Sequence, residues 1–476
     1  MTTPSREWTQ LAASAASLTD SKFLKIVELF ERIRHEPGIA DAMGMFRPRL
    51  VELRPPRRIT ASRLFFLPVE DLLDDLDRYQ RKLSRVCRAT IEPCWRIVSD
   101  GFGDKRLARL EKTLLETDSH DAHAMIRLGE PLWKEGSKAL SRALDEAETN
   151  QKARVALFGR DDDVLRQVAV TVAVTDIGAQ LQEVKAKLPD RPIQTLAEFH
   201  IETLRSAIKE LAQDDIRKVT PFLLVLSARM LRPGDLLAVL GDTRLDGYQQ
   251  EKDEMARDVG VFALENLLRQ SGDMSRAMGE GATARDIAGF AERLLDGFDS
   301  MKTTLQRPDQ KGMVKRVDRA RAVISDALLA KVIGPADQEL LGHVSKLAES
   351  NLLRMGLDEP EFPTPEEMGK AEEFARAYRR CARIAPLVGL KNEVQEKTAD
   401  ICRTVRKVSE NLGSVARPVR GPVRVDPAVA DEQFVSVLRL VEIIAGPDEA
   451  ETILMEWHDR IGDLPKPPPL DPWGGV

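Results

Sequence analysis

The stretch VAVTVAVTDIGAQLQEVKAKLP, residues 168–189, decides the fold class that we expect. Its apolar residues step along the chain by four, three, four, three and four positions: Val170, Val174, Ile177, Leu181, Val184 and Leu188. This spacing places them on one face of a helix, whereas a half-buried strand would alternate apolar and polar residues. The β-branched start alone is typical of a strand, but the spacing continues through Leu188 and predicts one helix that ends at Pro189.

Two other segments repeat this pattern and predict two more long helices. One extends from Ile287 to Leu305, and the other extends from Leu390 to Leu412 with Lys397 in its seam. Each series is shorter than the run of heptads that defines a coiled coil, so we expect helices packed antiparallel within one chain. The expected fold class is all-α, an elongated multi-helix bundle or irregular helical array with several long helices, with helix above about 60% of residues.

The remaining helices follow from shorter apolar stripes and from their capping residues. They are expected at 19–33, 68–90, 104–116, 121–148, 195–211, 220–231, 235–240, 245–270, 311–333 and 336–355. Pro131 should kink or split the helix that contains it, because proline lacks the N–H that a helix interior uses. Residues 271–283, SGDMSRAMGEGAT, combine glycines and small residues without periodicity, which predicts a mobile loop.

The composition along the chain predicts three helical regions and a tail. We expect an N-terminal region at 1–118 with a basic, proline-rich arm at 47–63, a central long-helix bundle at 119–357, a C-terminal region at 366–463, and a disordered tail at 464–476. The expected linkers are 358–365 and 417–427. Charge is also unevenly distributed along the chain. Residues 375–424 carry 12 basic and 4 acidic side chains, whereas residues 426–463 carry 2 basic and 10 acidic ones. These two segments should fold against each other, with an outside anion as the alternative partner of the basic one.

The overall composition narrows the class of protein. The 476 residues carry a net charge of −6, with 71 basic and 77 acidic side chains, so any basic patch must be local. Aromatic residues make up only 5%, which argues against a protein that stacks single-stranded bases. Four scattered cysteines, a polar start without a signal peptide and apolar runs too short to cross a bilayer predict a cytoplasmic protein with no transmembrane segment.

The most unusual local composition is that of the basic arm at residues 47–63. It has one acid, Glu52, and six arginines that are candidate partner-binding residues: Arg47, Arg49, Arg54, Arg57, Arg58 and Arg63. Its three prolines should keep the arm extended on the surface. The apolar run Leu64–Leu67 should then enter the core and fix the start of a helix at Pro68. Two interpretations stay open, because the arginines can bind an outside partner or wrap the chain's own acids at 71–77.

Metal and catalytic sites have weaker support in the sequence. His120 and His123 flank Asp121, an arrangement that can hold a metal and activate water, but further ligands are not evident. Cys87 and Cys94 could join them in a zinc site, although the gap between the cysteines exceeds the usual ligand spacing. The common phosphate-loop, dinucleotide, zincin, hydrolase and calcium-loop motifs do not occur. We therefore expect no catalytic residue, no metal and no cofactor.

These observations favour a non-enzymatic protein of the cytoplasm with an interaction, regulatory or scaffold role. Its expected partner is another protein, held by helix faces and the basic arm, and association with a second copy stays open. The alternative is a protein that binds nucleic acid or another anionic surface through Arg47–Arg63 and the basic residues of 376–424. A third hypothesis is a metal-dependent hydrolase centred on His120 and His123.

Overall fold

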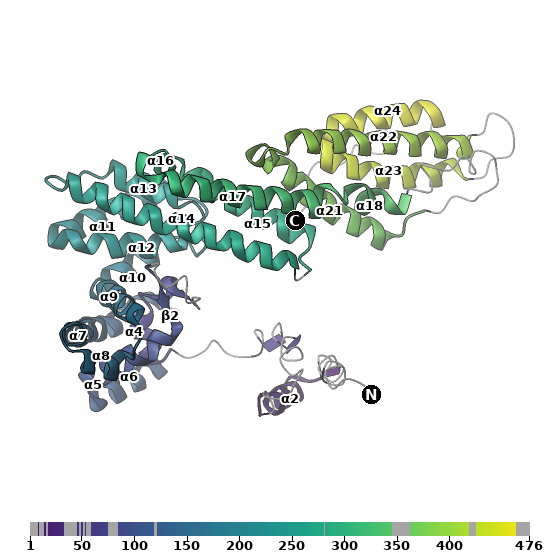
Figure 1. Ribbon diagram of the computed structural model, residues 1–476. Helices are drawn as coiled ribbons and strands as arrows, with labels where there is room; N and C mark the ends of the chain where they lie inside the picture. The colour runs from purple at the N-terminus through teal and green to yellow at the C-terminus, as the bar shows by residue number, and fades with distance from the viewer. Residues whose placement is uncertain are drawn as a thin grey trace.

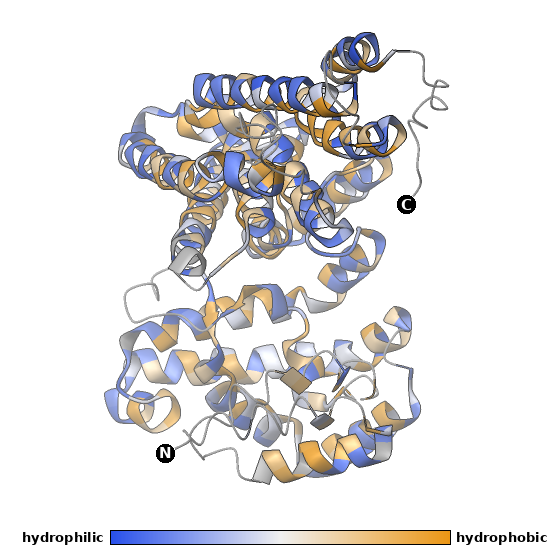
Figure 2. Ribbon diagram, turned by 90° about the vertical axis from the view of Figure 1, so that its right-hand side faces the viewer, coloured by the Kyte–Doolittle hydropathy of each residue, from blue (hydrophilic) through white to orange (hydrophobic). Residues whose placement is uncertain are grey.

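The computed structural model describes residues 8, 14–15, 18–32, 45–46, 49–50, 53, 59–74, 84–118, 121–279, 281–344, 362–417 and 425–462. This described part is 85% helical, which confirms the all-α prediction. Successive helices lie beside one another and form an elongated array (Figure 1). Their apolar faces turn toward one another and their polar faces turn outward (Figure 2).

The first core is built around α7 (Ala122–Thr149). The other helices of this core are α4 (Ala61–Phe66), α5 (Ile91–Phe102), α6 (Asp104–Glu116), α8 (Gln151–Phe158) and α9 (Asp162–Asp176). Asp121 starts α7 by accepting a hydrogen bond from the backbone N–H of Ala124 at 3.0 Å. α7 runs on past Pro131 and is not split there, because the adjacent Leu132 and Trp133 are fully buried and hold it in the core.

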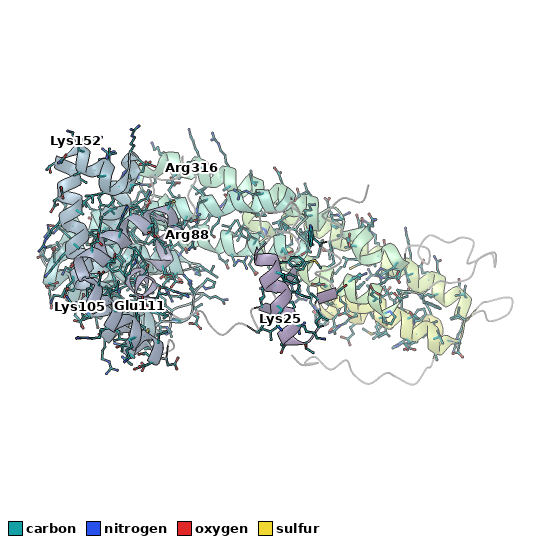
Figure 3. All side chains as sticks on the ribbon, turned by 90° about the horizontal axis from the view of Figure 1, so that it is seen from below. Lys25, Arg88, Lys105, Glu111, Lys152 and Arg316 are labelled. Carbon is teal, nitrogen blue, oxygen red and sulfur yellow. The ribbon has the colours of Figure 1, made fainter. Side chains whose placement is uncertain are left out.

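The apolar run that follows the basic arm enters this core, as predicted. Leu64, Phe65 and Phe66 of α4 are all buried. The indole N–H of Trp133 donates to the carbonyl oxygen of Leu64 at 2.9 Å. Glu111 of α6, labelled in Figure 3, accepts a hydrogen bond from the first backbone N–H of α4 at 2.7 Å. α4 is therefore fixed both by apolar burial and by hydrogen bonds to two neighbouring helices.

The second core joins the middle helices of the array. They are α10 (Gly178–Lys187), α11 (Glu198–Asp215), α12 (Val219–Arg229), α13 (Pro233–Asp242) and α14 (Gln249–Gly279). α12 has a strongly apolar sequence, and its residues from Pro221 to Ser227 are all buried. α14 continues beyond this core, because Val259 packs in the second core whereas Leu267 packs in the third. One long helix thus connects the two.

The third core contains the C-terminal half of the array. Its helices are α15 (Ala284–Ser300), α16 (Lys302–Leu305), α17 (Lys311–Leu328), α18 (Ala336–Leu341), α21 (Pro365–Ile384), α22 (Lys391–Ala416), α23 (Pro427–Ala445) and α24 (Pro447–Ile461). Capping boxes at Thr283 and Thr364 start α15 and α21. The two seams predicted in this half are confirmed, because Ile287, Leu294 and Phe298 are buried on α15 and Val394, Val405 and Leu412 are buried on α22.

The segment 168–189 is bent, so the prediction of one straight helix there is wrong. α9 ends at Asp176, α10 starts at Gly178, and their axes differ by 69°. A Cβ atom at residue 178 would lie 2.9 Å from the ring of Trp133, so only glycine lets the chain approach that side chain. Four of the seam residues are nevertheless buried, as their spacing predicted: Val174, Ile177, Leu181 and Val184.

The segment that follows α4 is not the helix expected at 68–90. Glu70–Leu72 form a single 3₁₀ turn, and β1 (Leu73–Asp74) pairs in parallel with β2 (Val86–Cys87). Residues 75–83 lie outside the described residues. The backbone extends here because Asp71 turns inward toward basic side chains of α10 and α12, which a continuous surface helix would not allow.

The segment 271–283 is also not the expected loop, because α14 extends to Gly279. Met274 is buried in the third core, and the hydroxyl of Ser271 donates to the carbonyl oxygen of Leu268 at 2.7 Å. Tertiary packing therefore outweighs the weak helix propensity of the small residues.

α2 (Asp20–Arg32) packs Phe23, Val27 and Phe30 against Phe46 in a small separate core.

In the described part of the chain no single helix is long and apolar enough to cross a membrane; the bent pair α9–α10 reaches that length and composition only when both helices are taken together. The tail 464–476 lies outside the described residues.

Candidate functional site

A cleft of about 760 Å³ opens between α15 and α21. These two helices lie near the middle of the array (Figure 1). Five arginines and one acid line it, together with small residues: Arg285, Arg376, Arg379, Arg380, Arg383, Glu373, Gly369 and Ala377. Such a concentration of guanidinium groups in one concave site is typical of a binding site for carboxylates or phosphates.

Two more clefts continue the first along α15. One of about 510 Å³ shares Arg285 and Glu373 with it and reaches toward α18. The other, of about 910 Å³, shares Arg380 and lies between α15 and the helices α11 and α13. Four arginines and four acids line this larger cleft, so its charge is balanced. The three together form one groove, which we call the α15 groove, and its central part is the most basic.

The sequence of α21 explains why its arginines face the groove. Its apolar residues Phe374, Tyr378 and Cys381 are buried at helical spacing against the third core. The arginines of this helix fall on the remaining face. The hydroxyl of Tyr378 donates to the carbonyl oxygen of Val394 at 3.0 Å, and burial raises the pKa of Tyr378 to about 12. α21 is thus fixed to α22, and the arginine face keeps a defined orientation.

Glutamates orient the arginines of the groove without covering them. Glu292 of α15 accepts from Arg380 at 3.0 Å and from Arg383 at 2.7 Å. Glu373 pairs with Arg285, and Glu372 pairs with Arg376, each at 2.9 Å. Arg379 donates to the carbonyl oxygens of Glu442 and Ile443 at the C-terminal end of α23. Five arginines therefore face three glutamates, which leaves two positive charges.

The arginines remain accessible to a ligand. The side chains of Arg285, Arg376 and Arg383 are 70%, 65% and 64% exposed. A guanidinium carries several N–H donors, so a single carboxylate partner leaves others for a ligand. Gly289 of α15 also helps to shape the site, because a Cβ atom there would lie 3.0 Å from Arg380 Nη1. The glycine allows Arg380 to lie close to the α15 backbone.

The basic segment at 375–424 is divided between two roles. Arg406 of α22 pairs with Glu449 and Glu456 of α24 at 2.9 and 3.2 Å, and Arg460 pairs with Glu410 at 3.3 Å. The prediction that the basic and acidic segments fold against each other is confirmed for these helices. The arginines of α21 instead face the α15 groove. The sequence indicated this basic segment but not the helix that it would face.

The basic arm is described only in part. Arg49 binds within the chain: it donates to the carbonyl oxygen of Leu18 and to Asp20 at 2.8 Å, and it lies over the ring of Phe23 at 4.5 Å. Arg63 lies within α4, where its side chain is exposed. The prediction of an extended arm is wrong at both residues, since each has helical backbone. Thr60 caps α4, the helix that contains Arg63. Phe46, three residues before Arg49, is buried in the small core of α2.

The other predicted partner-binding residues, Arg47, Arg54, Arg57 and Arg58, lie outside the described residues. Neither Arg49 nor Arg63 lines the α15 groove. The arm and the groove are therefore separate candidates.

The metal-site candidates do not come together in the described part of the chain. No group of histidine, cysteine and acidic side chains there could hold a metal ion. His123 is exposed in the first turn of α7, and His120 is not among the described residues. Cys94 is buried in the first core, and burial raises the pKa of its thiol to about 12. Neither His123 nor Cys94 lines the α15 groove.

A second group of charged side chains surrounds the buried carboxylate of Asp71. Asp71 forms ion pairs with Lys185 at 2.7 Å, Arg191 at 2.9 Å and Arg229 at 3.2 Å. Burial alone would raise the pKa of Asp71, but these cations outweigh it and hold the pKa below its ordinary value. Burial also lowers the pKa of Lys185, which Asp71 offsets only in part. We call these four residues the Asp71 cluster.

The neighbouring Asp74 extends this arrangement toward α14. It pairs with Arg85 at 3.2 Å and with Arg269 of α14. Burial, together with the nearby Arg269, lowers the pKa of Arg85 to about 10. These pairs have no local sequence signal, because Arg85 follows Asp74 by 11 residues and Arg191 and Arg229 follow Asp71 by 120 and 158.

Comparison of the chain with known protein families, curated proteins and solved structures finds no match. The geometry of the α15 groove therefore carries the argument about function.

Proposed function

We propose that this chain is a non-enzymatic docking protein that holds an acidic segment of a partner protein in the α15 groove. The observation that supports this proposal is the central cleft, where five arginines accompany a single lining acid. Carboxylates bind guanidinium groups through paired hydrogen bonds, so a peptide rich in glutamate or aspartate complements this cleft. Apart from the carboxylate of Glu373, which pairs with Arg285, the described lining of the cleft offers no cysteine, histidine, serine or threonine that could serve as a nucleophile or a general base.

The distribution of charge favours a short acidic segment over a nucleic acid. The adjoining cleft brings Asp235, Asp242 and Asp296 into the groove, and these carboxylates would repel a phosphate backbone that continued along it. No aromatic side chain lines the central cleft, so unpaired bases would find no stacking surface there. The negative charge of the whole chain also opposes long-range attraction of a polyanion.

Isothermal titration calorimetry with an acetylated peptide of alternating glutamate and glycine tests the proposal. Wild-type protein should bind this peptide, and Arg376→Gln combined with Arg383→Gln should weaken binding by about tenfold or more, because two charge-assisted hydrogen bonds are lost. Arg217→Gln combined with Arg403→Gln is the matched control, since both side chains are strongly exposed and line no part of the groove. Equal binding by the two double variants would disprove the proposal.

The alternative function, binding of nucleic acid or another anionic surface through the basic arm, remains a prediction. It is supported by the exposure of Arg63 and by the six arginines of the arm. Capture of partners from a lysate with and without nuclease treatment distinguishes the two. Loss of the captured material after nuclease treatment, and after replacement of Arg54, Arg57 and Arg58 by glutamate, would favour the arm. Resistance to both changes would favour the α15 groove.

A further inference from the structure

A separate groove of about 520 Å³ lies between α10 and α11. We propose that this groove binds a basic amphipathic helix of a partner protein. It shares no lining residue with the α15 groove, so the inference goes beyond the proposed function. The lining residues follow helical spacing on both sides: Gln180, Glu183, Val184 and Lys187 on α10, and Phe199, Glu202, Thr203, Ser206, Ala207, Glu210 and Leu211 on α11.

Phe199 provides an apolar contact at one end of this groove. This residue is 61% exposed, which is the largest exposure among the bulky apolar residues of the described chain. The ring packs against His200 with 3.8 Å between the ring centroids. Nδ1 of His200 in turn accepts a hydrogen bond from the backbone N–H of Ala197 at 3.0 Å, which fixes His200 at the start of α11. Phe199 is thus held in position while its ring remains free for a partner.

The floor and the length of the groove suit a helix. Val184, Ala207 and Leu211 form an apolar floor, and the small side chains of Ser206 and Ala207 leave room for close approach. The lining residues of α11 extend from Phe199 to Leu211, which corresponds to about 18 Å at the rise of an α-helix. A partner helix of about 12 residues would cover that length.

The charge on the rim indicates which helix would bind. Glu183, Glu202 and Glu210 stand against Lys187 alone, so the rim carries two negative charges. Glu202 pairs with Arg205 on the same helix, whereas the described residues provide no ion-pair partner for Glu183 or Glu210. A partner helix with leucines on one face and lysines or arginines beside them would match both the floor and the rim. The same rim would repel phosphate groups and acidic peptides.

The test uses two synthetic peptides of equal composition and isothermal titration calorimetry. The first repeats the heptad LKKLLKL and forms an amphipathic helix, and the second repeats LKLKLKL, which has the same composition but alternates within each heptad and so opposes an amphipathic helix. Wild-type protein should bind the first peptide more tightly than the second. Phe199→Ala should weaken binding of the first by about tenfold or more. Leu387→Ala, which removes an exposed apolar side chain elsewhere, should leave binding unchanged.

A charge-reversed variant distinguishes binding in this groove from nonspecific binding of cationic peptides. Glu183→Lys combined with Glu210→Lys changes the rim from two negative to two positive charges. This variant should lose the lysine peptide and gain binding of a peptide that repeats LEELLEL. Glu393→Lys combined with Glu396→Lys, on exposed positions of α22, is the matched control and should behave as wild type.

Four results would overturn the inference. The first three are equal binding of the two lysine peptides, unchanged affinity in Phe199→Ala, and continued binding of the lysine helix by the charge-reversed rim. A wild-type dimer that Phe199→Ala dissolves, with no peptide binding, would assign the groove to a second copy of the chain and also overturn it. Failure here leaves the binding of glutamate peptide in the α15 groove untouched, so the two proposals fail separately.

Discussion

Arginine side chains gather in two regions of this molecule, the Asp71 cluster and the α15 groove, and the two regions balance their charge differently. The Asp71 carboxylate is only 2% exposed, and it is surrounded by cations from α10, α12 and the loop between α10 and α11. In the α15 groove, Arg285, Arg376 and Arg383 keep most of their side-chain surface in water. Buried ion pairs of the first kind constrain the fold, whereas exposed guanidinium groups of the second kind remain available to a ligand.

The Asp71 cluster lies at the connection between the first core and the second. Glu70–Leu72 and β1 connect the first core to the second, and their carboxylates contact α10, α12 and α14. The charges therefore join segments that are far apart in the sequence. The α15 groove lies between α15 and α21. Both helices contribute buried apolar residues to the third core, so their packing does not depend on the arginines.

The largest effect should come from removal of the buried carboxylate. Asp71→Asn would leave Lys185 and Arg229 buried without a counter-charge, which should lower the free energy of unfolding by about 3–5 kcal/mol. Urea denaturation measures this value. Glu372→Gln, which removes one carboxylate that pairs with Arg376 beside the groove, is the control and should cost less than about 1 kcal/mol. Similar losses in the two variants would remove the distinction between the two regions.

The contribution of Asp71 to the free energy of unfolding should depend on pH. The pKa of Asp71 is lower in the folded protein than its ordinary value, so its ion pairs stabilise the fold fully above the unfolded pKa, near 4. That stabilisation should be lost as the pH falls through the folded pKa. Unfolding free energies of wild type and Asp71→Asn should therefore converge below about pH 4. A difference that stays constant from neutral pH to pH 3 would show that the charge of Asp71 does not contribute.

A smaller effect is expected from the exposed arginines. Arg376→Gln combined with Arg383→Gln should change the unfolding free energy by less than about 1 kcal/mol, because exposed ion pairs gain little over hydration. The same variant should lose the acidic peptide. A loss of stability as large as that of Asp71→Asn would mean that these arginines serve the fold and not a partner.

The smallest effect should come from Gly289→Ala. Alanine favours a helix over glycine by up to about 1 kcal/mol, and the new Cβ would displace only the flexible end of Arg380. Stability should therefore remain equal or rise slightly, while affinity for the acidic peptide falls a few-fold. Unchanged affinity would show that the position of Arg380 is not needed for binding.

Much of the fold could be predicted from local spacing. The seams of α15 and α22 and the cap of α7 depend on residues within a few turns, so the sequence alone indicates them. The bend between α9 and α10 depends on contact between Gly178 and Trp133, which only the folded chain brings about. The pairing of β1 with β2 similarly depends on distant cations around Asp71. Local patterns do not contain such information.

The candidate sites were less predictable than the fold. The basic character of α21 is evident in the sequence, but its partner helix α15 and the role of Gly289 are set by tertiary packing. Phe199 carries no sequence signal that separates it from a core phenylalanine, since only the packing of α10 against α11 leaves its ring exposed. Arg49 had been expected to bind a partner, and its contacts with Asp20 and Phe23 became evident only from the structure.

The burial of Trp133 in the first core provides an intrinsic optical probe. Its indole donates to the carbonyl oxygen of Leu64, whereas Trp457 of the third core donates to Asp431 at 2.8 Å and packs on Phe434. Each indole should emit at short wavelength when folded and shift to the red when its own core opens. In two variants that each keep one of these tryptophans, with the other four replaced by phenylalanine, the emission of Trp133 would follow the first half of the array and that of Trp457 the second. Coincident transitions would mean that α14 transmits unfolding from one end to the other.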